Sequence, residues 1–366
     1  MRFPEFSGEW ETKSINDLAD VIGGGTPDTT VKSYWDGGIQ WFTPSEIGKN
    51  KFVDASLRTI TEDGLNNSSA KLLPPNTILL SSRATIGECS LSLRECATNQ
   101  GFQSLVSKKC NVDFLYYLIQ TKKKDLIRKS CGSTFLEISA NEVRKIQVSV
   151  PSDVEQQKIA GLLSLIDKRI ATQNKIIEDL KKLKSAISER LFKSVKGFTV
   201  LLSDLCDIVK GKQINGENLS DSGNYYVMNG GTEPSGYYDN YNVEASTISI
   251  SEGGNSCGYV QFNTSPFWSG GHCYSIQNIA DKVDNMYLYH YLKSNEDAIM
   301  KLRIGSGLPN IQKKDLAMFK IIVPKIEWQI KISTFLSSLE RKAEIEERIL
   351  NVMQKQKLYL LQQMFI

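Results

Sequence analysis

Histidine is scarce in this sequence, and its cysteines are scattered. There are only two histidines, His272 and His290, and the seven cysteines form no CxxC pair. Zinc sites and disulfide frameworks need closely spaced or evenly paired ligands, so the sequence predicts neither. The neighbours His272 and Cys273 have no evident acidic partner, and side chains adjacent in a strand point apart. We therefore interpret Cys273 as a buried thiol and not as a nucleophile.

Long apolar runs are also absent. No run approaches the 18 residues that a membrane-spanning helix needs, and the first residues lack the layout of a secretion signal. We expect a cytoplasmic protein.

Sequence motifs of the common catalytic sites are missing as well. There is no phosphate-binding G-x-x-x-x-G-K-[ST], and Pro27-Asp28 has no acidic-x-Lys partner of a nuclease core. Leu73-Pro74-Pro75-Asn76 differs from the Asn/Asp-Pro-Pro-aromatic signature of amino-methyltransferases, and the glycine-rich run at 253–258 is not GxGxxG. The sequence therefore offers no motif of a P-loop motor, of this type of nuclease core or of an amino-methyltransferase.

Strong positive charge is lacking too. The formal net charge is +3, and no segment is polybasic. Binding to DNA by phosphate neutralisation alone is therefore not indicated, so base and shape readout or contacts from other subunits would have to contribute.

What the sequence does contain is a long segment written twice. The stretch from Val150-Pro151 to Leu191-Phe192 returns without a gap, 173 positions later, at Val323-Pro324 to Met364-Phe365. Both copies carry apolar residues at alternating steps of four and three, which is typical of a long helix packing along another helix. Such a helix, at ~1.5 Å per residue, would be roughly 57 Å long. The expected pairing residues are Ile159, Leu163, Ile166, Ile170, Gln173, Ile177, Leu180, Lys184 and Ile187 in the first copy, and Leu336, Leu339, Glu346, Leu350, Met353, Lys357 and Leu360 in the second.

A single helix of this kind would indicate an oligomerisation coiled coil. Two equivalent copies in one chain favour pairing with each other, and a two-fold axis across them makes the pair antiparallel. We expect Lys184 to lie opposite Glu346 and Gln173 opposite Lys357, because polar residues in an apolar seam often set the register.

The repeat extends beyond the long helices. Phe114-Leu115-Tyr116-Tyr117-Leu118 matches Tyr287-Leu288-Tyr289-His290-Tyr291, and Ile138 matches Ile311. The predicted fold class is α+β, with two globular α/β domains, two long antiparallel coiled-coil helices and an internal pseudo-two-fold repeat. We expect globular domains at 1–150 and 198–324, and long helices at 151–197 and 325–366. The two domains differ mainly in their loops, as expected for modules that read different ligands or that have drifted.

These features together resemble the specificity subunit of type I restriction-modification enzymes. Each globular domain is followed by a long helix with Val-Pro at its entrance and Gln156 or Gln329 in its first turn. The phrases at 23–27 (GGGTP), 39–45 (IQWFTPS) and 82–87 (SRATIG) resemble the first target-recognition domain of that family. The likeness covers nearly the whole chain.

The resemblance implies a non-catalytic subunit that binds double-stranded DNA. Residues 1–150 and 198–324 would each read one half of a bipartite target, and the long helices would fix the spacing and dock methyltransferase subunits, two of them in our expectation. Motor and nuclease subunits would join for restriction. S-adenosylmethionine, ATP and magnesium would belong to those partners and not to this chain.

Candidate base-reading residues lie in the polar loops of each domain. Arginine suits guanine, asparagine and glutamine suit adenine, and lysine more often positions a phosphate. We expect DNA contacts from Thr26, Thr43, Ser45, Arg83, Thr85, Ser133 and Thr134 in the first domain, and from Lys210, Lys212, Gln213, Asn229, Asn255, Ser306 and Asn310 in the second.

Two other interpretations remain open on the sequence alone. One is a non-catalytic coiled-coil scaffold whose globular domains bind peptides or glycans. The other is a specificity subunit in a fused restriction-methyltransferase system of another type. Co-purification with a methyltransferase would separate DNA recognition from a scaffold role.

Overall fold

The computed structural model describes residues 2–132, 136–305 and 309–365. The chain divides into two compact units, Met1–Asn174 with Ile349–Ile366, and Lys175–Arg348. Each unit contains a globular part and one end of each of the two long helices, α6 (Asp153–Ser194) and α10 (Ile326–Met364).

The globular part of the first unit contains a five-stranded and a three-stranded sheet. The five-stranded sheet has the order β2-β9-β6-β7-β4, and the three-stranded sheet has the order β5-β3-β8. The strands are β2 Ala19–Gly23, β3 Trp35–Phe42, β4 Phe52–Val53, β5 Arg58–Ile60, β6 Ile78–Leu80, β7 Cys89–Ser92, β8 Cys96–Thr98 and β9 Gln103–Ser107. The short helices are α1 Ile15–Leu18, α2 Glu62–Asn66, α4 Lys123–Arg128 and α5 Ala140–Arg144.

The globular part of the second unit contains a four-stranded sheet, β12-β18-β15-β16, and a three-stranded sheet, β14-β13-β17. The strands are β12 Asp207–Lys210, β13 Tyr225–Met228, β14 Tyr237–Tyr238, β15 Thr247–Ser251, β16 Val260–Asn263, β17 Trp268–Ser269 and β18 Cys273–Gln277. Two short helices follow the sheets, α8 Glu296–Met300 and α9 Lys313–Ala317.

In both units the chain enters and leaves the globular part along a two-stranded ribbon. Strand β1 (Glu11–Ser14) pairs with β10 (Gln147–Val150), so that Glu11 lies opposite Val150. Strand β11 (Phe198–Leu201) pairs in the same way with β19 (Lys320–Val323), and Phe198 lies opposite Val323. The second strand of each ribbon leads directly into a long helix.

An aromatic helix joins each globular part to the long helices. These helices are α3 (Val112–Thr121) and α7 (Asn285–Ser294), and most of their residues are buried. Phe114 of α3 shares a core with Ile159 and Leu163 of α6. Tyr287 of α7 contacts Phe192 near the other end of α6, with 5.8 Å between ring centroids. The aromatic stretches that the sequence repeats are therefore the packing elements of the two units.

A buried glutamine in the first turn of each long helix completes the cap of the aromatic helix. The Oε1 atom of Gln156 accepts a hydrogen bond from the backbone N–H of Asn111, the N-cap of α3, at 3.0 Å. The Oε1 atom of Gln329 accepts from the N–H of Asp284, the N-cap of α7, at 2.8 Å. Each amide also donates to the carbonyl of the preceding proline, Pro151 or Pro324. The unpaired donor at a helix start is thus satisfied from another helix.

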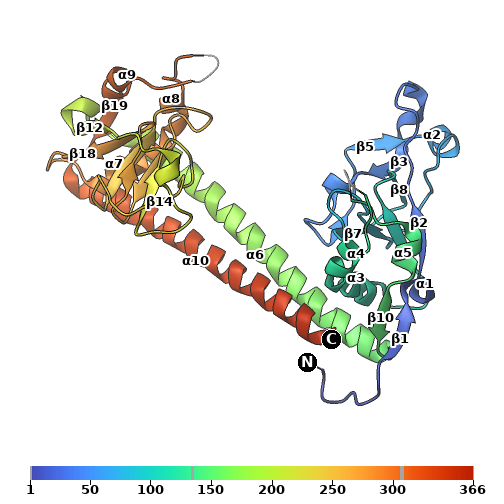
Figure 1. Cartoon of the computed structure of the whole chain (residues 1–366). Coiled ribbons are helices and arrows are strands. Elements are labelled where there is room, and N and C mark those ends of the chain that lie inside the picture. Colours follow the sequence, from blue (N-terminus) through green and yellow to red (C-terminus); the bar gives the residue numbers. More distant parts are fainter. Residues whose placement is uncertain (1, 133–135, 306–308, 366) are drawn as a thin grey trace. The chain divides into compact units, whose positions relative to one another are not determined.

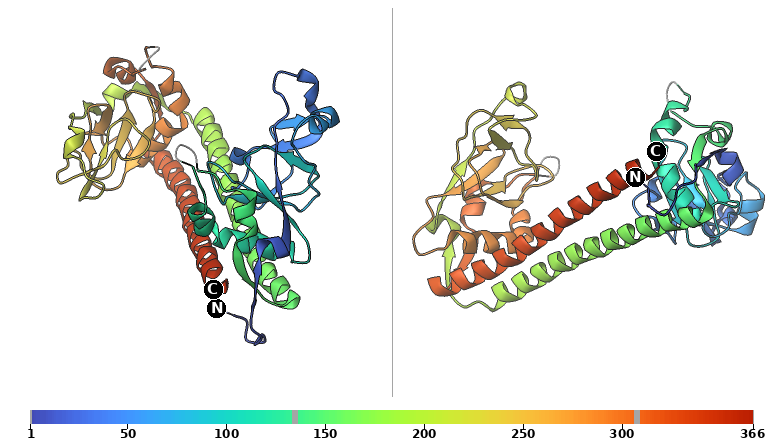
Figure 2. Two further views of the ribbon diagram at one scale, coloured as in Figure 1. Left: turned by 45° about the vertical axis from the view of Figure 1, so that its right-hand side comes forward. Right: turned by 90° about the horizontal axis from the view of Figure 1, so that it is seen from below.

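Within each unit, the ends of α6 and α10 lie side by side and run antiparallel (Figures 1 and 2). In the first unit, Asp167 pairs with Lys357 at 2.6 Å, and Leu163 shares a core with Leu361 and Met364. In the second unit, Lys184 pairs with Glu340, and Lys181 pairs with Glu347. The expectation of two long antiparallel helices is confirmed.

The register that we expected for these helices is wrong. Lys184 was expected opposite Glu346 and Gln173 opposite Lys357, but Lys184 pairs with Glu340 and Lys357 pairs with Asp167. These two ion pairs are the same contact made twice, since Asp167 and Lys184 correspond to Glu340 and Lys357 in the repeat. The acidic partners flank the apolar seam, and the aromatic helices hold them there. The hydroxyls of Tyr117 and Tyr289 donate to Asp167 and Glu340 at 2.6 and 3.1 Å.

Each of the expected pairing residues is buried or half-buried in the structure, including Ile170, Ile177, Leu180 and Met353. By contrast, Leu165 and Leu183, which lie off the seam, are 60% and 50% exposed. The burial of the expected pairing residues is consistent with the expected seam.

The polar contact around each ion pair differs at one position. In the first unit Tyr117 lies beside Ser164, whereas in the second the equivalent His290 bonds to Ser337 at 2.9 Å through Nε2. Burial lowers the pKa of His290 from 6.5 to about 4. The structure thus holds this imidazole in its neutral form.

This histidine gives a pH-dependent prediction. Because its pKa is lowered on folding, the His290 side chain binds more protons in the unfolded chain than in the folded one between pH 6.5 and pH 4. Its contribution to stability is present above pH 6.5 and is lost as the pH falls toward 4. Relative to His290→Gln, the wild type should lose up to about 3 kcal/mol of unfolding free energy across this range. Urea unfolding at several pH values measures it, and parallel pH profiles for the two proteins would contradict it.

Candidate nucleic-acid interface

The candidate residues of the first unit gather at one edge of its five-stranded sheet. At this edge β2 and β6 end and β7 and β9 begin, because Gly23 pairs with Gln103 and Leu80 pairs with Cys89. We call this edge, with the loops at 24–31, 43–46, 81–88 and 99–102, the first loop edge. Antiparallel neighbours bring these loops together although they are distant in sequence.

Thr26, Thr43 and Ser45 lie on neighbouring loops of this edge. The hydroxyl of Thr26 bonds to the side chain of Gln100. The hydroxyl of Thr43, just before the short turn 44–46, donates to the Glu46 carboxylate at 2.6 Å and lies 3.1 Å from the hydroxyl of Ser45. The N–H of Asn99 donates to the carbonyl of Phe42, which joins the turn to the 99–102 loop. Hydrogen bonds thus hold the loops that carry the hydroxyl groups of this edge.

Arg83 and Thr85 lie on the loop that follows β6. Arg83 is 44% exposed and forms an ion pair with Glu137 at 2.8 Å, and the backbones of these residues form a bridge. Its Nε is buried without a hydrogen-bond partner within the described residues. The hydroxyl of Thr85 bonds to that of Ser81 at 3.1 Å. Ser133 and Thr134 lie outside the described residues.

The second unit has an equivalent edge, where β12 and β15 end and β16 and β18 begin. We call it the second loop edge. Lys212 and Gln213 follow β12 and are exposed, and the Lys212 carbonyl accepts from the Trp268 indole at 2.9 Å. Asn229 Oδ1 accepts from the N–H of His272 at 3.2 Å. Asn310 forms backbone bridges to Gly253 and Ile304, and Asn255 lies exposed in the turn after Gly254. Ser306 lies outside the described residues.

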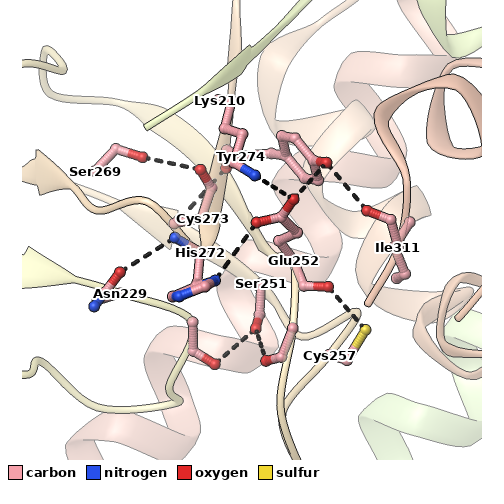
Figure 3. A network of polar contacts seen from close by, with 12 residues as sticks. Lys210, Asn229, Ser251, Glu252, Cys257, Ser269, His272, Cys273, Tyr274 and Ile311 are labelled. Carbon is pink, nitrogen blue, oxygen red and sulfur yellow. Dashed lines mark hydrogen bonds and ion pairs between the residues drawn. The ribbon is translucent and has the colours of Figure 1, made fainter. Parts of the chain in front are cut away.

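A buried carboxylate lies behind the exposed side chains of this edge (Figure 3). The Glu252 side chain is 7% exposed, and its Oε1 lies 2.6 Å from Nζ of Lys210. The Tyr274 hydroxyl lies 3.1 Å from the same oxygen and 3.1 Å from the Ile311 carbonyl. His272 Nδ1 lies 3.7 Å from Oε2. Burial and the Glu252 charge raise the pKa of Tyr274, which keeps its hydroxyl protonated as a donor.

The two loop edges share one backbone frame. Ile138 donates its N–H to the carbonyl of Ser82 at 3.1 Å, and Ile311 donates to that of Glu252 at 2.8 Å. Asn99 donates to Phe42 in the first unit, and Gly270 donates to Met228 in the second. Thr43 and Asn229, each following one of these carbonyls, therefore occupy equivalent positions. Sequence reasoning proposed both residues but missed their equivalence, because the loops before them differ in length.

Nowhere in the ranges 2–132, 136–305 and 309–365 do three or more histidine, cysteine or acidic side chains cluster as metal ligands would. Among the helices described, none combines the length and the apolar character needed to cross a membrane.

Comparisons with known proteins point to one family. The model of the type I restriction modification DNA specificity domain matches residues 7–182 and 197–355. The type I restriction enzyme MjaIX specificity subunit of Methanocaldococcus jannaschii is 39% identical over 180 residues, which are 48% of this chain and 42% of that protein. The chain thus matches less than half the length of this relative. The EcoprrI specificity subunit of Escherichia coli is 24% identical, with 91% and 88% of the two chains covered.

Solved structures agree on the fold. The crystal structure of the S subunit of a type I restriction-modification system from M. genitalium superposes with a TM-score of 0.65 at 18% identity. It covers 100% of this chain and 99% of its own. At this level of identity the likeness shows a shared fold.

Proposed function

Because the chain belongs to the family of type I restriction modification DNA specificity domains, we propose that it is a DNA-recognition subunit that does no chemistry itself. The first and second loop edges would each read one half of a bipartite target in double-stranded DNA. The observation that carries this proposal is the pair of equivalent loop edges. Each has the same pattern of backbone hydrogen bonds, but the two present different polar side chains.

The remaining parts of the proposed role concern the long helices and the partner subunits. The helices would set the spacing between the half-sites and dock methyltransferase subunits, two in our proposal, and motor and nuclease subunits would join them. S-adenosylmethionine, ATP and magnesium would be bound by those partners. We also propose a cytoplasmic location, where a DNA-recognition subunit would meet its target. The domain bounds 1–150 and 198–324, with helices at 151–197 and 325–366, belong to this proposal.

Co-expression with the methyltransferase subunits of its own system tests the proposal. Methylation sequencing of the host should reveal one bipartite, asymmetric target, and a duplex carrying that target should shift the assembled complex in a gel. A complex that contains a methyltransferase but binds the target duplex no better than a scrambled one would favour a scaffold role instead.

Arg83→Ala tests base reading at the first loop edge. If the guanidinium contacts a guanine, the substitution should cost about 1–3 kcal/mol of binding free energy at one base position of one half-site. Competition binding against single-base variants of the target measures the effect. A uniform loss across all sequences would make Arg83 a phosphate contact.

Arg94→Ala is the matched control. Arg94 also pairs with a carboxylate, Asp54, at 2.6 Å, but it lies beyond the opposite end of β7 from the first loop edge. We expect DNA binding by this variant to be unchanged.

A further inference from the structure

Glu252 is not required by the frame that the two loop edges share. Its equivalent in the first unit is Ser82, whose carbonyl accepts the same backbone hydrogen bond but whose buried hydroxyl has no hydrogen-bond partner within the described residues. A buried charge costs free energy unless it is paired and hydrogen-bonded. A carboxylate that only the second unit places at this position therefore needs an explanation other than the fold.

Two exposed donors flank Glu252, one at the end of β12 and one just before β18. Lys210, the last residue of β12, is 53% exposed and contacts Oε1 of Glu252. His272, just before β18, is 62% exposed and faces Oε2. The Tyr274 hydroxyl contacts Oε1 of the carboxylate from the buried side (Figure 3).

The exposed donor groups of Lys210 and His272 are suited to binding an anion. Lysine ammonium groups are the usual partners of DNA phosphates. Because Nδ1 of His272 faces the carboxylate, Nε2 is the ring nitrogen left to meet a ligand. The carboxylate behind them limits the freedom of both side chains, which lowers the entropy that binding must remove.

We propose that Glu252 is a positioning residue that holds Lys210 and His272 side by side to contact a backbone phosphate of the DNA half-site read by the second loop edge. This inference rests on the proposed function and deepens it. It adds His272 and Glu252 to the residues expected from the sequence, and it assigns to Lys210 the phosphate contact that lysines most often make. The first loop edge has no such device, because Ser82 and Gly101 occupy the equivalent positions.

The test is a double-mutant cycle on the assembled complex with the target duplex found by methylation sequencing. Lys210→Met and Glu252→Gln should each weaken binding about 10-fold. The double variant should bind no more weakly than about the level of Lys210→Met, since both changes remove one contact. Lys210→Met should also reduce the slope of log affinity against log salt by about 1. His272→Gln should weaken binding in the same direction.

Two further variants keep the result interpretable. Glu252→Ser places the residue of the first unit in the second and covers the case in which Glu252→Gln fails to fold. Asp207→Asn is the control, because Asp207 is an exposed carboxylate at the opposite end of β12, bonded to Asn278 at 2.7 Å. Its DNA affinity should equal that of the wild type.

Four outcomes would overturn the inference. Unchanged affinity in Glu252→Gln or Glu252→Ser, or fully additive losses in the cycle, would remove the positioning role while the wild type still selects its target. An unchanged salt slope in Lys210→Met would remove the phosphate contact. A wild-type complex with no preference for the target would overturn the proposed function and this inference with it.

Discussion

Reversing the charge of Lys184 should destabilise the second unit by about 3 kcal/mol, lowering its melting temperature by on the order of 10 °C. The Lys184 and Glu340 side chains are only 22% and 27% exposed, so water cannot fully replace the lost partner. Lys184→Glu would also place two carboxylates in contact. The variant Lys184→Glu/Glu340→Lys should recover most of the loss, and thermal unfolding followed by circular dichroism measures all three proteins.

Lys181→Glu is the matched control for this reversal. Lys181 lies one turn away on α6 and pairs with Glu347 at 2.6 Å, but the two side chains are 61% and 43% exposed. Exposed ion pairs contribute about 0–1 kcal/mol, so its melting temperature should change little. If the two variants lose equal stability, or if Glu340→Lys gives no rescue, the Lys184–Glu340 pair does not set the register.

Replacing Gln329 with leucine should cost about 3 kcal/mol of unfolding free energy, because several buried polar groups lose their partners at once. Gln329 is 0% exposed, and its amide bonds to the N–H of Asp284 and to the carbonyls of Lys282 and Pro324. Leucine fills a similar volume but satisfies none of them. Denaturant unfolding of Gln329→Leu against wild type measures the loss.

Two further variants separate the effect of the lost hydrogen bonds from the effects of side-chain size and of position on the helix. Gln329→Glu keeps an acceptor for Asp284 but removes both donors and buries a charge, so it should be at least as destabilising as leucine. Gln354→Leu, at an exposed position of α10, should change stability by less than about 0.5 kcal/mol. A loss from Gln329→Leu as small as that of Gln354→Leu would mean that the cap does not depend on the glutamine.

The sequence predicted the long helices well because their signal is periodic. The spacing of Ile159, Leu163 and Ile177 depends only on helix geometry, and the repeat required two such helices that pair in opposite directions. The register was wrong because it was set by the seam alone. Asp167 and Glu340, the partners of Lys357 and Lys184, lie beside the seam and also accept hydrogen bonds from Tyr117 and Tyr289. Those tyrosines belong to the globular parts, and no pattern within the helices reveals them.

The positions of the loop edges could be predicted from the sequence, but the hydrogen-bond partners of their residues could not. Thr26, Arg83 and Lys210 were proposed because polar turn residues follow short strands, and the structure places each at a sheet edge. Glu252 was missed because nothing in Ser251-Glu252-Gly253 distinguishes a buried carboxylate from an exposed one. Its burial depends on Tyr274 and Lys210, which β18 and β12 bring to it. Hydrogen bonds between strands that are distant in sequence have no local signal.

The ribbons β1–β10 and β11–β19 have a consequence for how such a chain can change. Since the strand that enters each globular part is bonded to the strand that leaves it, residues added or removed between them need not move the long helix that follows. The two halves of this chain already differ by a net 14 residues before they return to a constant offset. Insertions and deletions in the globular parts can therefore change ligand preference. The surfaces of the long helices, which other proteins would bind, keep their length.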